Sequence, residues 1–359
     1  MAEAVKEPLY FDQSIDESKI ESAGFEALKK VRPQWDPTGV KSKVLSGGIT
    51  NKLVCFYEDG KFGEDTIVIR VYGQKTDLII DRDSEKKNMI VLSKEDICPP
   101  LYAVFKNALM YGFASGQVLD EKTVRDTHIG KLVAKELVKL QLVKSSERTD
   151  GSKPRSELFD KLDDWISKMP EKFDDPVKQE KFSRHIKPRS VLQSEVAILK
   201  EHLGAMECPI VYAHNDLLVG NVIFNEKSDK VTFIDHEYGM FNYQPFDIGN
   251  HFCEFAGIEE VDYNLYPDKE FQMGWLRSYL QAWNQAQGKS TDVPQSELET
   301  FYVYVNKCAV TAHFFWGVWA IIQSKYSTID FDYLEYAVIR FGEYFRRKEE
   351  FLSLEVPSK

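Results

Sequence analysis

The sequence predicts an α+β fold with an antiparallel sheet in its first third and mainly helices after it. Residues 43–116 carry short apolar runs rich in β-branched residues, which favours strands. From Asp126 the apolar residues recur every three or four positions, as in a helix with one buried face. The change of period near residue 118 predicts two parts, residues 1–117 and residues 118–359.

The first part is expected to form a sheet of about five strands with one inserted helix. The predicted strands are residues 43–45, 52–57 and 66–72, and the two arms of a hairpin over 101–116 that turns at residues 106–107. The charged segment DRDSEKKNMIVL has the composition of the inserted helix. Before the sheet, SKIESAGFEALKKVRPQW predicts a short helix that ends before Pro33.

The second part is expected to be helical apart from one interval. HIGKLVAKELVKLQLV predicts its first helix. Residues 144–190 are rich in Lys, Asp, Glu, Ser and Pro, and they predict a solvated excursion with one helix at LFDKLDDWI. Between Ile210 and Glu254, the short apolar runs Val222–Phe224 and Val231–Ile234 predict a hairpin.

The composition favours a globular chain and argues against a nucleic-acid partner. Of 359 residues, 46 are Lys or Arg and 57 are Asp or Glu, so the formal charge is −11. Nucleic-acid binders depend on clustered cations, and the sequence has no dense basic stripe, so a small cationic substrate suits this charge better. The five cysteines are odd in number and lack metal-ligand spacing, which favours free thiols without structural zinc.

The sequence also predicts a cytosolic chain without a membrane span. Its start, MAEAVKEPLYFDQSIDE, lacks the basic residues and apolar run of a secretory signal. The longest near-apolar run, Ala309–Ile322, covers about 14 residues, whereas a span needs roughly 20. This run therefore predicts a buried helix, and no pattern specifies an oligomeric state.

The interval at 210–254 carries the pattern H-x-D-x-x-x-x-N. His214, Asp216 and Asn221 come just before the predicted hairpin, and Asp235 follows directly after it. In phosphoryl transfer one Asp orients or accepts the proton of the attacking hydroxyl, while an Asn and a second Asp supply oxygen ligands to Mg²⁺. Each residue alone is equally typical of a polar turn. Together with two flanking strands they favour magnesium-dependent phosphoryl transfer.

These motifs resemble those of the choline/ethanolamine kinase family. The resemblance runs from about Val44 to Phe345, and it is strongest in HNDLLVGN, IDHEYGMFNYQPFDIGNHFCE and HFFWGVWAIIQSKYSTIDFDYLEY. It implies a protein-kinase-like bilobed fold, with an antiparallel-sheet lobe that holds the nucleotide and a mainly helical lobe with the catalytic loop and the amino-alcohol pocket. The active site would lie between the lobes. The resemblance also implies ATP and Mg²⁺ as cofactors, Asp216 as catalytic base, and Asn221 and Asp235 as magnesium ligands.

The resemblance assigns nucleotide binding to three further segments. Ser46–Lys52 would cover the phosphates, because glycines let the backbone approach anionic oxygens, although SGG is also typical of a plain hairpin. Arg70 stands where protein kinases carry a phosphate-contacting lysine, with Glu85 as its ion-pair partner; the alternative is a strand arginine facing solvent. Tyr111–Gln117 would connect the lobes. The residues expected to bind ATP are Ser46, Gly47, Gly48, Thr50, Asn51, Arg70, Glu85, Tyr111, Phe113, Gln117 and Asp235.

The acceptor pocket is expected among aromatic residues of the second part, because aromatic faces and carboxylates together hold cationic amines. Aromatic residues three apart on an apolar helix are also typical of a core. Glu254 lies in the apolar run HFCEFAG, where a carboxylate has to be paired or functional, and Asp247 would orient His214 or the catalytic loop. The residues expected to bind the acceptor are Asp216, Tyr238, Glu254, Trp316, Trp319 and Tyr336.

Ethanolamine is the favoured acceptor, and choline is the close alternative. The ammonium of ethanolamine has three hydrogen-bond donors and the quaternary nitrogen of choline has none. HNDLL, VYGQKTDLIIDRD and EFAGIEEVDYNLYP resemble the ethanolamine kinase branch, whereas choline kinases usually carry glutamine at the position of Leu218. His236 departs from the aromatic residue common at its place, so it either tunes the metal site or faces away.

Two further hypotheses are an inactive kinase fold used as a binding scaffold and an aminoglycoside phosphotransferase. The presence of Arg70, Asp216, Asn221 and Asp235 argues against a disabled enzyme. The long string IDHEYGMFNYQPFDIGNHFCE argues against the aminoglycoside enzymes, which resemble this chain only in the shorter motif.

Overall fold

The computed structural model divides the chain into two compact units. It describes residues 7–45, 51–63, 65–73, 80–143, 154–258, 260–327 and 329–358. The first unit comprises Met1–Val118 and Ile223–Glu237, and the second comprises Leu119–Val222 and Tyr238–Lys359. The sequence assigned the hairpin after Val222 to the second part, whereas the structure groups it with the first unit.

A six-stranded sheet forms most of the first unit. Its strands are β1 (Leu9–Tyr10), β2 (Val40–Leu45), β3 (Asn51–Glu58), β4 (Ile67–Tyr72), β5 (Leu101–Val104) and β6 (Ala108–Gly112), in the order β1-β5-β6-β4-β3-β2. The five longer strands pair antiparallel, as predicted. The sixth strand, β1, pairs parallel with β5 and was not predicted, because two residues are too few to show a period.

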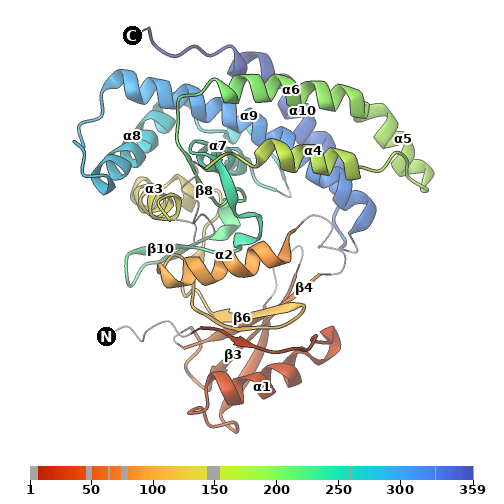
Figure 1. The fold of residues 1–359 in the computed structure, drawn as a ribbon, viewed down its shortest axis with the longest axis vertical. Helices are drawn as coiled ribbons and strands as arrows, with labels where there is room; N and C mark the ends of the chain where they lie inside the picture. Colours follow the sequence, from red (N-terminus) through yellow and green to blue (C-terminus); the bar gives the residue numbers. More distant parts are fainter. Residues whose placement is uncertain are drawn as a thin grey trace. The chain divides into compact units, whose positions relative to one another are not determined.

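Two helices pack against this sheet. All six residues of β4 are buried, which places this strand in the interior. Helix α1 (Ile20–Val31) contacts β3 and β4, and a Cβ at Gly24 would overlap the ring of Phe56, so the absence of a side chain lets the helix approach closely. Helix α2 (Arg82–Lys94) contacts β5 and lies on the opposite side of the sheet from α1 in Figure 1.

A smaller sheet completes the first unit. It has the order β10-β9-β7, with strands β7 (Gln117–Val118), β9 (Val222–Asn225) and β10 (Lys230–Phe233). A Cβ at Gly116 would lie 2.5 Å from the carbonyl oxygen of Phe224, and the φ of Gly116 is 149°. Only glycine therefore allows the chain to reach β7 so close to β9.

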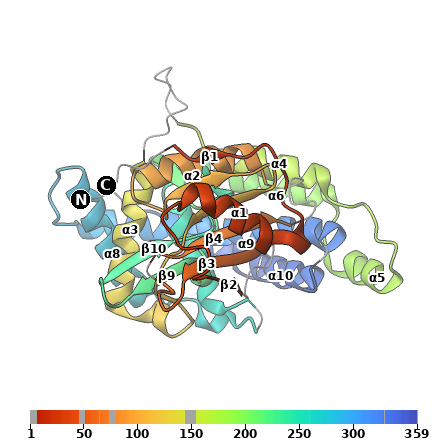
Figure 2. The ribbon, with the colours of Figure 1, turned by 90° about the horizontal axis from the view of Figure 1, so that it is seen from below.

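The second unit is mainly helical. Its helices are α3 (Thr127–Gln141), α4 (Leu158–Lys168), α5 (Pro176–His185), α6 (Arg189–Gly204), α7 (Phe246–Cys253), α8 (Lys269–Ala286), α9 (Gln295–Tyr326) and α10 (Tyr333–Leu352). A two-stranded sheet pairs β8 (Ile210–Ala213) with β11 (Met240–Tyr243). Helices α3 and α8 lie side by side, as Figures 1 and 2 both show.

Helix α9 forms the core of the second unit. Among the described residues it alone is long and apolar enough to cross a membrane, but 94% of its most apolar window is buried inside the structure. It packs against α4, α6, α7, α8 and α10. This burial is the arrangement of a core helix, as predicted for Ala309–Ile322.

The predicted excursion at 144–190 is partly wrong. Helix α4 lies within this range, and its Trp165 is fully buried, with a ring centroid 4.5 Å from that of Phe315 on α9. The charged composition of the segment concealed a helix that belongs to the core. In contrast, α5 has no buried residue, which fits the prediction. Residues 144–153 lie outside the described part of the chain.

Candidate active site

Arg70 is the centre of a charged cluster in the first unit. It lies in β4, is 4% exposed, and forms ion pairs through Nη2 with Glu85 of α2 and through Nη1 with Asp235. Burial lowers the pKa of Arg70, but the charges of Asp235, Tyr111 and Glu237 outweigh burial and raise it. The Arg70–Glu85 pair agrees with the sequence expectation, and the alternative of a strand arginine facing solvent is excluded.

Asp235 follows β10 in an unusual backbone conformation. Its φ is 64°, in the left-handed region that few residues other than glycine adopt. Its side chain is 31% exposed, whereas those of Arg70 and Glu85 are almost fully buried. The hairpin of β9 and β10 therefore presents one carboxylate at the edge of a buried charge cluster, and strained residues of this kind cluster at functional sites.

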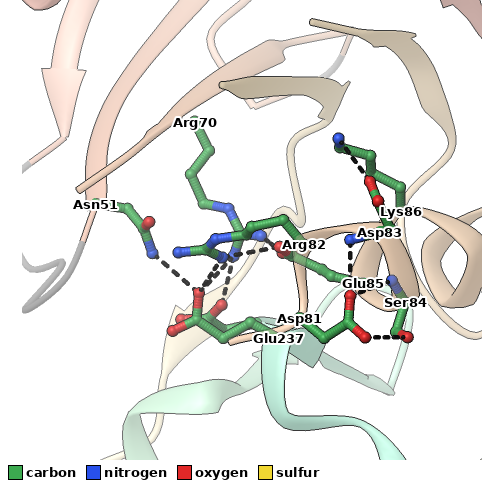
Figure 3. Close-up of polar contacts among 10 residues, drawn as sticks. Asn51, Arg70, Asp81, Arg82, Asp83, Ser84, Glu85, Lys86 and Glu237 are labelled. Atoms are coloured by element: carbon green, nitrogen blue, oxygen red, sulfur yellow. Dashed lines mark hydrogen bonds and ion pairs between the residues drawn. The ribbon is translucent and has the colours of Figure 1, made fainter. Parts of the chain in front are cut away.

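Sequence reasoning missed two members of this cluster, Arg82 and Glu237. Glu237 is almost fully buried, and its Oε2 accepts hydrogen bonds from Arg82 at 3.0 Å and from Asn51 Nδ2 at 3.3 Å. Figure 3 shows these three side chains pointing toward one another. Burial and the nearby Asp235 raise the pKa of Glu237, while Arg70 and Arg82 oppose this rise. The missed signal was a second acidic residue two positions after Asp235.

The remaining residues expected to bind the nucleotide lie on or beside strands of both sheets of the first unit. Tyr111 lies in β6, and burial raises its pKa to about 12, with Arg70 opposing this rise. Phe113 donates its backbone N–H to the carbonyl of Thr66 at 2.8 Å, and Gln117 is an exposed residue of β7. Asn51 begins β3. The expectations for Ser46, Gly47, Gly48 and Thr50 fall outside the described residues.

The second unit holds the H-x-D-x-x-x-x-N motif in a loop after β8. Asp247 of α7 accepts the backbone N–H groups of His214 at 3.0 Å and of Asn215 at 2.7 Å, so it orients the loop as expected. Asn215 has a φ of 64°, and its Nδ2 donates to the carbonyls of Ala213 and Tyr238, both at 3.0 Å. These bonds give hydrogen-bond partners to backbone carbonyls where the chain leaves regular structure. They also hold Asn215, the residue directly before Asp216.

Asp216 and Asn221 lie at the two ends of this loop and contact each other. Asn221 Nδ2 donates to the carbonyl of Asp216 at 2.9 Å and to its carboxylate Oδ2 at 3.3 Å. Between them, the backbone carbonyl of Leu217 accepts a hydrogen bond from Nδ1 of His251 at 3.0 Å. Burial lowers the pKa of His251 to about 4. The loop is thus fastened on both sides of Asp216, whose side chain is partly exposed.

Three of the predicted aromatic residues form one cluster. The ring of Trp316 lies 5.1 Å from that of Tyr238 and 5.4 Å from that of Trp319, and Trp319 Nε1 donates to the hydroxyl of Tyr238 at 2.8 Å. Asn250 accepts from Trp316 Nε1 at 2.8 Å. Burial raises the pKa of the fourth predicted ring, Tyr336, while Arg340 opposes this rise.

Glu254 forms a buried ion pair that the sequence did not reveal. Its Oε1 lies 2.7 Å from Nη1 of Arg340, and both side chains are almost fully buried. Arg340 also donates to the hydroxyl of Tyr336 at 3.2 Å. No described residue bonds to Glu254 Oε2. The pair with Arg340 explains how a carboxylate is accommodated in the apolar run HFCEFAG. It uses Oε1 of Glu254, so that Oε2 can accept a hydrogen bond from another group.

The oxygen atoms of the motif fit magnesium better than zinc. Among the described residues, no group of three or more His, Cys, Asp or Glu side chains is arranged to hold a metal ion, and all five cysteines are free. Protein Mg²⁺ sites use one or two carboxylates together with substrate phosphates. Asn221 Oδ1 and Asp235 Oδ2 have no hydrogen-bond donor among the described residues, which suits such a role.

A family model described as choline/ethanolamine kinase matches residues 42–345. The chain belongs to the choline/ethanolamine kinase family. Ethanolamine kinase 1 of Mus musculus is 43% identical over 345 residues, which cover 96% of this chain and 94% of the mouse protein. The structure of the Plasmodium vivax ethanolamine kinase aligns with a TM-score of 0.76 at 25% identity, over 92% of this chain and 89% of that chain.

Membership of the choline/ethanolamine kinase family confirms the resemblance found in the sequence. A choline kinase of Cryptosporidium parvum shares the fold, with a TM-score of 0.73 at 23% identity over 92% of this chain and 96% of that chain. The predicted α+β, protein-kinase-like fold is therefore confirmed. The matched range includes both the sheet that carries Arg70 and the loop that carries Asp216.

Proposed function

We propose that this protein is an ethanolamine kinase, which transfers the γ-phosphoryl group of ATP to the hydroxyl of ethanolamine. The observation that carries the proposal is the similarity to a mouse ethanolamine kinase along almost the whole of both chains. The product would be phosphoethanolamine, the first intermediate of the CDP-ethanolamine route to phosphatidylethanolamine. The enzyme would act in the cytoplasm on a small molecule, and its net charge of −11 disfavours nucleic acid.

Asp216 would be the catalytic base. Its carboxylate is partly exposed and lies in a loop that Asp247 and His251 hold in place, so it can meet a substrate hydroxyl without rearrangement of the loop. A base fastened in this way contributes through orientation as well as proton transfer, because a hydroxyl has to approach the phosphorus in line. Asn221 would keep the carboxylate of Asp216 directed through its amide.

Asn221 and Asp235 would supply oxygen ligands to magnesium, which when bound neutralises the charge of the nucleotide phosphates. The side-chain oxygens Asn221 Oδ1 and Asp235 Oδ2, which receive no hydrogen bond from a described residue, support these roles. Arg70 would contact the phosphates of ATP from β4, with Glu85 and Asp235 holding its guanidinium. Tyr111, Phe113 and Gln117 would line the adenine side, and Asn51 would follow the phosphate-covering turn at Ser46–Thr50.

The acceptor amine would be held by Tyr238, Trp316, Trp319 and Tyr336 together with Glu254. Because Arg340 neutralises the charge of Glu254, this carboxylate would act chiefly as a hydrogen-bond acceptor through Oε2. An ammonium N–H can use such an acceptor, whereas the quaternary nitrogen of choline cannot. The aromatic cluster supports choline as a second candidate, since rings attract quaternary ammonium ions.

The test is a comparison of kcat/KM for ethanolamine and choline under saturating ATP and Mg²⁺. We expect a preference for ethanolamine of about tenfold or more, because one N–H bond to a desolvated acceptor contributes on the order of 1–3 kcal/mol. A tenfold preference for choline would reassign the substrate. Binding of ATP and Mg²⁺ without product from either alcohol would favour a scaffold instead.

A further inference from the structure

The charge cluster of the first unit contains a second arginine, Arg82. The proposed phosphate contact is made by Arg70, so it does not explain why Arg82 is present. Arg82 is the first residue of α2, where the positive end of the helix dipole disfavours a cation. The neighbouring residues of this first turn, Asp83 and Glu85, have the sign that the dipole favours. The position of Arg82 is therefore explained by its contacts beyond the helix and not by helix stability.

Those contacts join α2 to the segment after β10. Arg82 Nη1 lies 2.8 Å from Glu85 Oε2 and 3.0 Å from Glu237 Oε2, and its guanidinium lies 4.1 Å from the ring centroid of Tyr72. Of the ion pairs that Glu237 forms with Arg82 and Arg70, at 3.0 and 3.9 Å, the pair with Arg82 is the closer. Figure 3 shows both arginines directed at Glu237.

The balance of charge gives Arg82 a role in this cluster. Among the described residues, two guanidinium groups face three carboxylates in this cluster, Glu85, Asp235 and Glu237, so these five side chains sum to −1. Removal of Arg82 would leave a sum of −2 in a largely buried site. Glu237 would keep the more distant Arg70, at 3.9 Å, but its repulsion of Asp235, whose backbone has a φ of 64°, would be less well offset.

We propose that Arg82 is a positioning residue for nucleotide binding, which acts through Glu237 to hold Asp235 in the orientation that receives the magnesium-bound phosphates. The inference rests on the proposed ATP-dependent function. It differs from a direct phosphate contact, because Arg82 would matter only while Glu237 carries its charge. Its loss would weaken the magnesium-dependent part of nucleotide affinity more than the part that needs no metal.

The chain offers a matched control in Arg32. Its guanidinium lies 4.1 Å from the ring centroid of Tyr102 and 3.0 Å from Asp65, and its side chain is 14% exposed, against 11% for Arg82. The two arginines thus have the same stacking and similar burial, but the carboxylate partner of Arg32, Asp65, is 52% exposed, whereas Glu237 is 2% exposed. Among the described residues, the side chain of Arg32 contacts Val31, Asp65 and Tyr102, none of which belongs to the Arg70 cluster.

The experiment is calorimetric titration with a non-hydrolysable ATP analogue, with and without Mg²⁺ and without any alcohol. We expect Arg82→Met to raise the Kd about tenfold with Mg²⁺ and less than threefold without it, while Arg32→Met changes either value less than twofold. Arg82→Met in a Glu237→Gln background should add less than twofold to the Kd of Glu237→Gln alone. Increases in Kd that multiply in the double variant, or an Arg82→Met increase that is equal with and without Mg²⁺, would overturn the inference.

Two outcomes separate this inference from the proposed function. A wild-type protein that binds no nucleotide would overturn both, whereas a wild type that binds normally beside an Arg82→Met variant of equal affinity would overturn the inference alone. If Arg82→Met does not fold, Arg82→Lys replaces it, since lysine keeps the charge but not the two-pronged contact. We expect a Kd with Mg²⁺ at least threefold above wild type, and an unchanged Kd would overturn the inference.

Discussion

At the scale of single residues, the proposed roles would separate nucleotide binding from proton transfer at Asp216. Asp216 contacts Asn221 within its own loop, while the charges that would meet the phosphates lie on other elements. Removal of the charge at Asp216 should therefore affect turnover without removing the groups that bind nucleotide.

We expect Asp216→Asn to lower kcat with ethanolamine by about 10²–10⁴-fold, the contribution typical of a positioned base. The Kd for ATP and Mg²⁺ should stay within a few fold of wild type. Asp163→Asn, an exposed position on α4, serves as control and should leave both values unchanged. Turnover at the wild-type rate in Asp216→Asn would show that another group accepts the proton.

The same scale shows what sequence reasoning can and cannot find at a site. His214, Asp216 and Asn221 were found because they occupy one short motif, and Asp235 because it follows a strand at a fixed interval. The ion pairs Arg82–Glu237 and Arg340–Glu254 join residues 155 and 86 positions apart. Nothing local marks such partners, because a buried carboxylate looks the same in the sequence whether it is paired or not.

At the scale of elements, the contact between α7 and α9 depends on one glycine. A Cβ at Gly249 would lie 2.6 Å from the backbone nitrogen of Ala309 and 2.7 Å from the carbonyl oxygen of Val305. Backbone atoms of a 32-residue core helix cannot move aside cheaply. Since α7 also carries Asp247 and His251, its distance from α9 determines where the loop after β8 is held.

We expect Gly249→Ala to lower the free energy of unfolding by about 1–3 kcal/mol through overpacking, and to lower turnover with it. Gly274→Ala on α8 is the matched control, because nothing lies within 4 Å of its Cβ. That substitution should raise stability by about 0.4–1 kcal/mol, as alanine favours helix. Equal effects in urea denaturation would contradict the role given to the α7–α9 contact.

Elements with a long, regular pattern were predicted best. Helices α1, α2 and α3 and strands β2 to β6 appear where the periodicity indicated, within a few residues. The short strands β1, β7, β8 and β11 were not predicted, whereas β9 and β10, also only four residues long, were predicted because a polar turn between two apolar runs indicates a hairpin. Helix α4 was predicted as a helix but assigned to solvent, because the charges on its exposed face and in its flanks outweighed the buried stripe that includes Trp165.

At the scale of the whole molecule, stability should depend on pH through Asp247. Burial raises the pKa of this carboxyl from 3.8 to about 6, against the effect of the N–H donors of Asn215 and His214. The folded chain therefore binds this proton more tightly than the unfolded chain. The resulting stabilisation is complete below about pH 4 and is lost as the pH rises through 6.

The difference in unfolding free energy between wild type and Asp247→Asn should follow this titration. Because asparagine does not titrate, we expect wild type minus variant to fall between about pH 4 and pH 6.5 and then to level off. Urea denaturation at half-unit pH steps measures this difference, and the other titrating groups cancel in it. A difference that stays constant across the range would show that Asp247 keeps its charge state.

The pairing of β7 with β9 has a consequence for how this protein can be dissected. Val118 lies opposite Ile223, although residues 119–222 intervene, so part of the second unit is an insertion within a hairpin of the first. A cut after Val118 would remove β9, β10 and Asp235, and would leave the buried Arg70 without one of its carboxylates. Joining Val118 to Ile223 through an Asn-Gly turn would instead close a two-residue hairpin. We therefore expect that the first unit can be prepared by excision and splicing rather than by truncation.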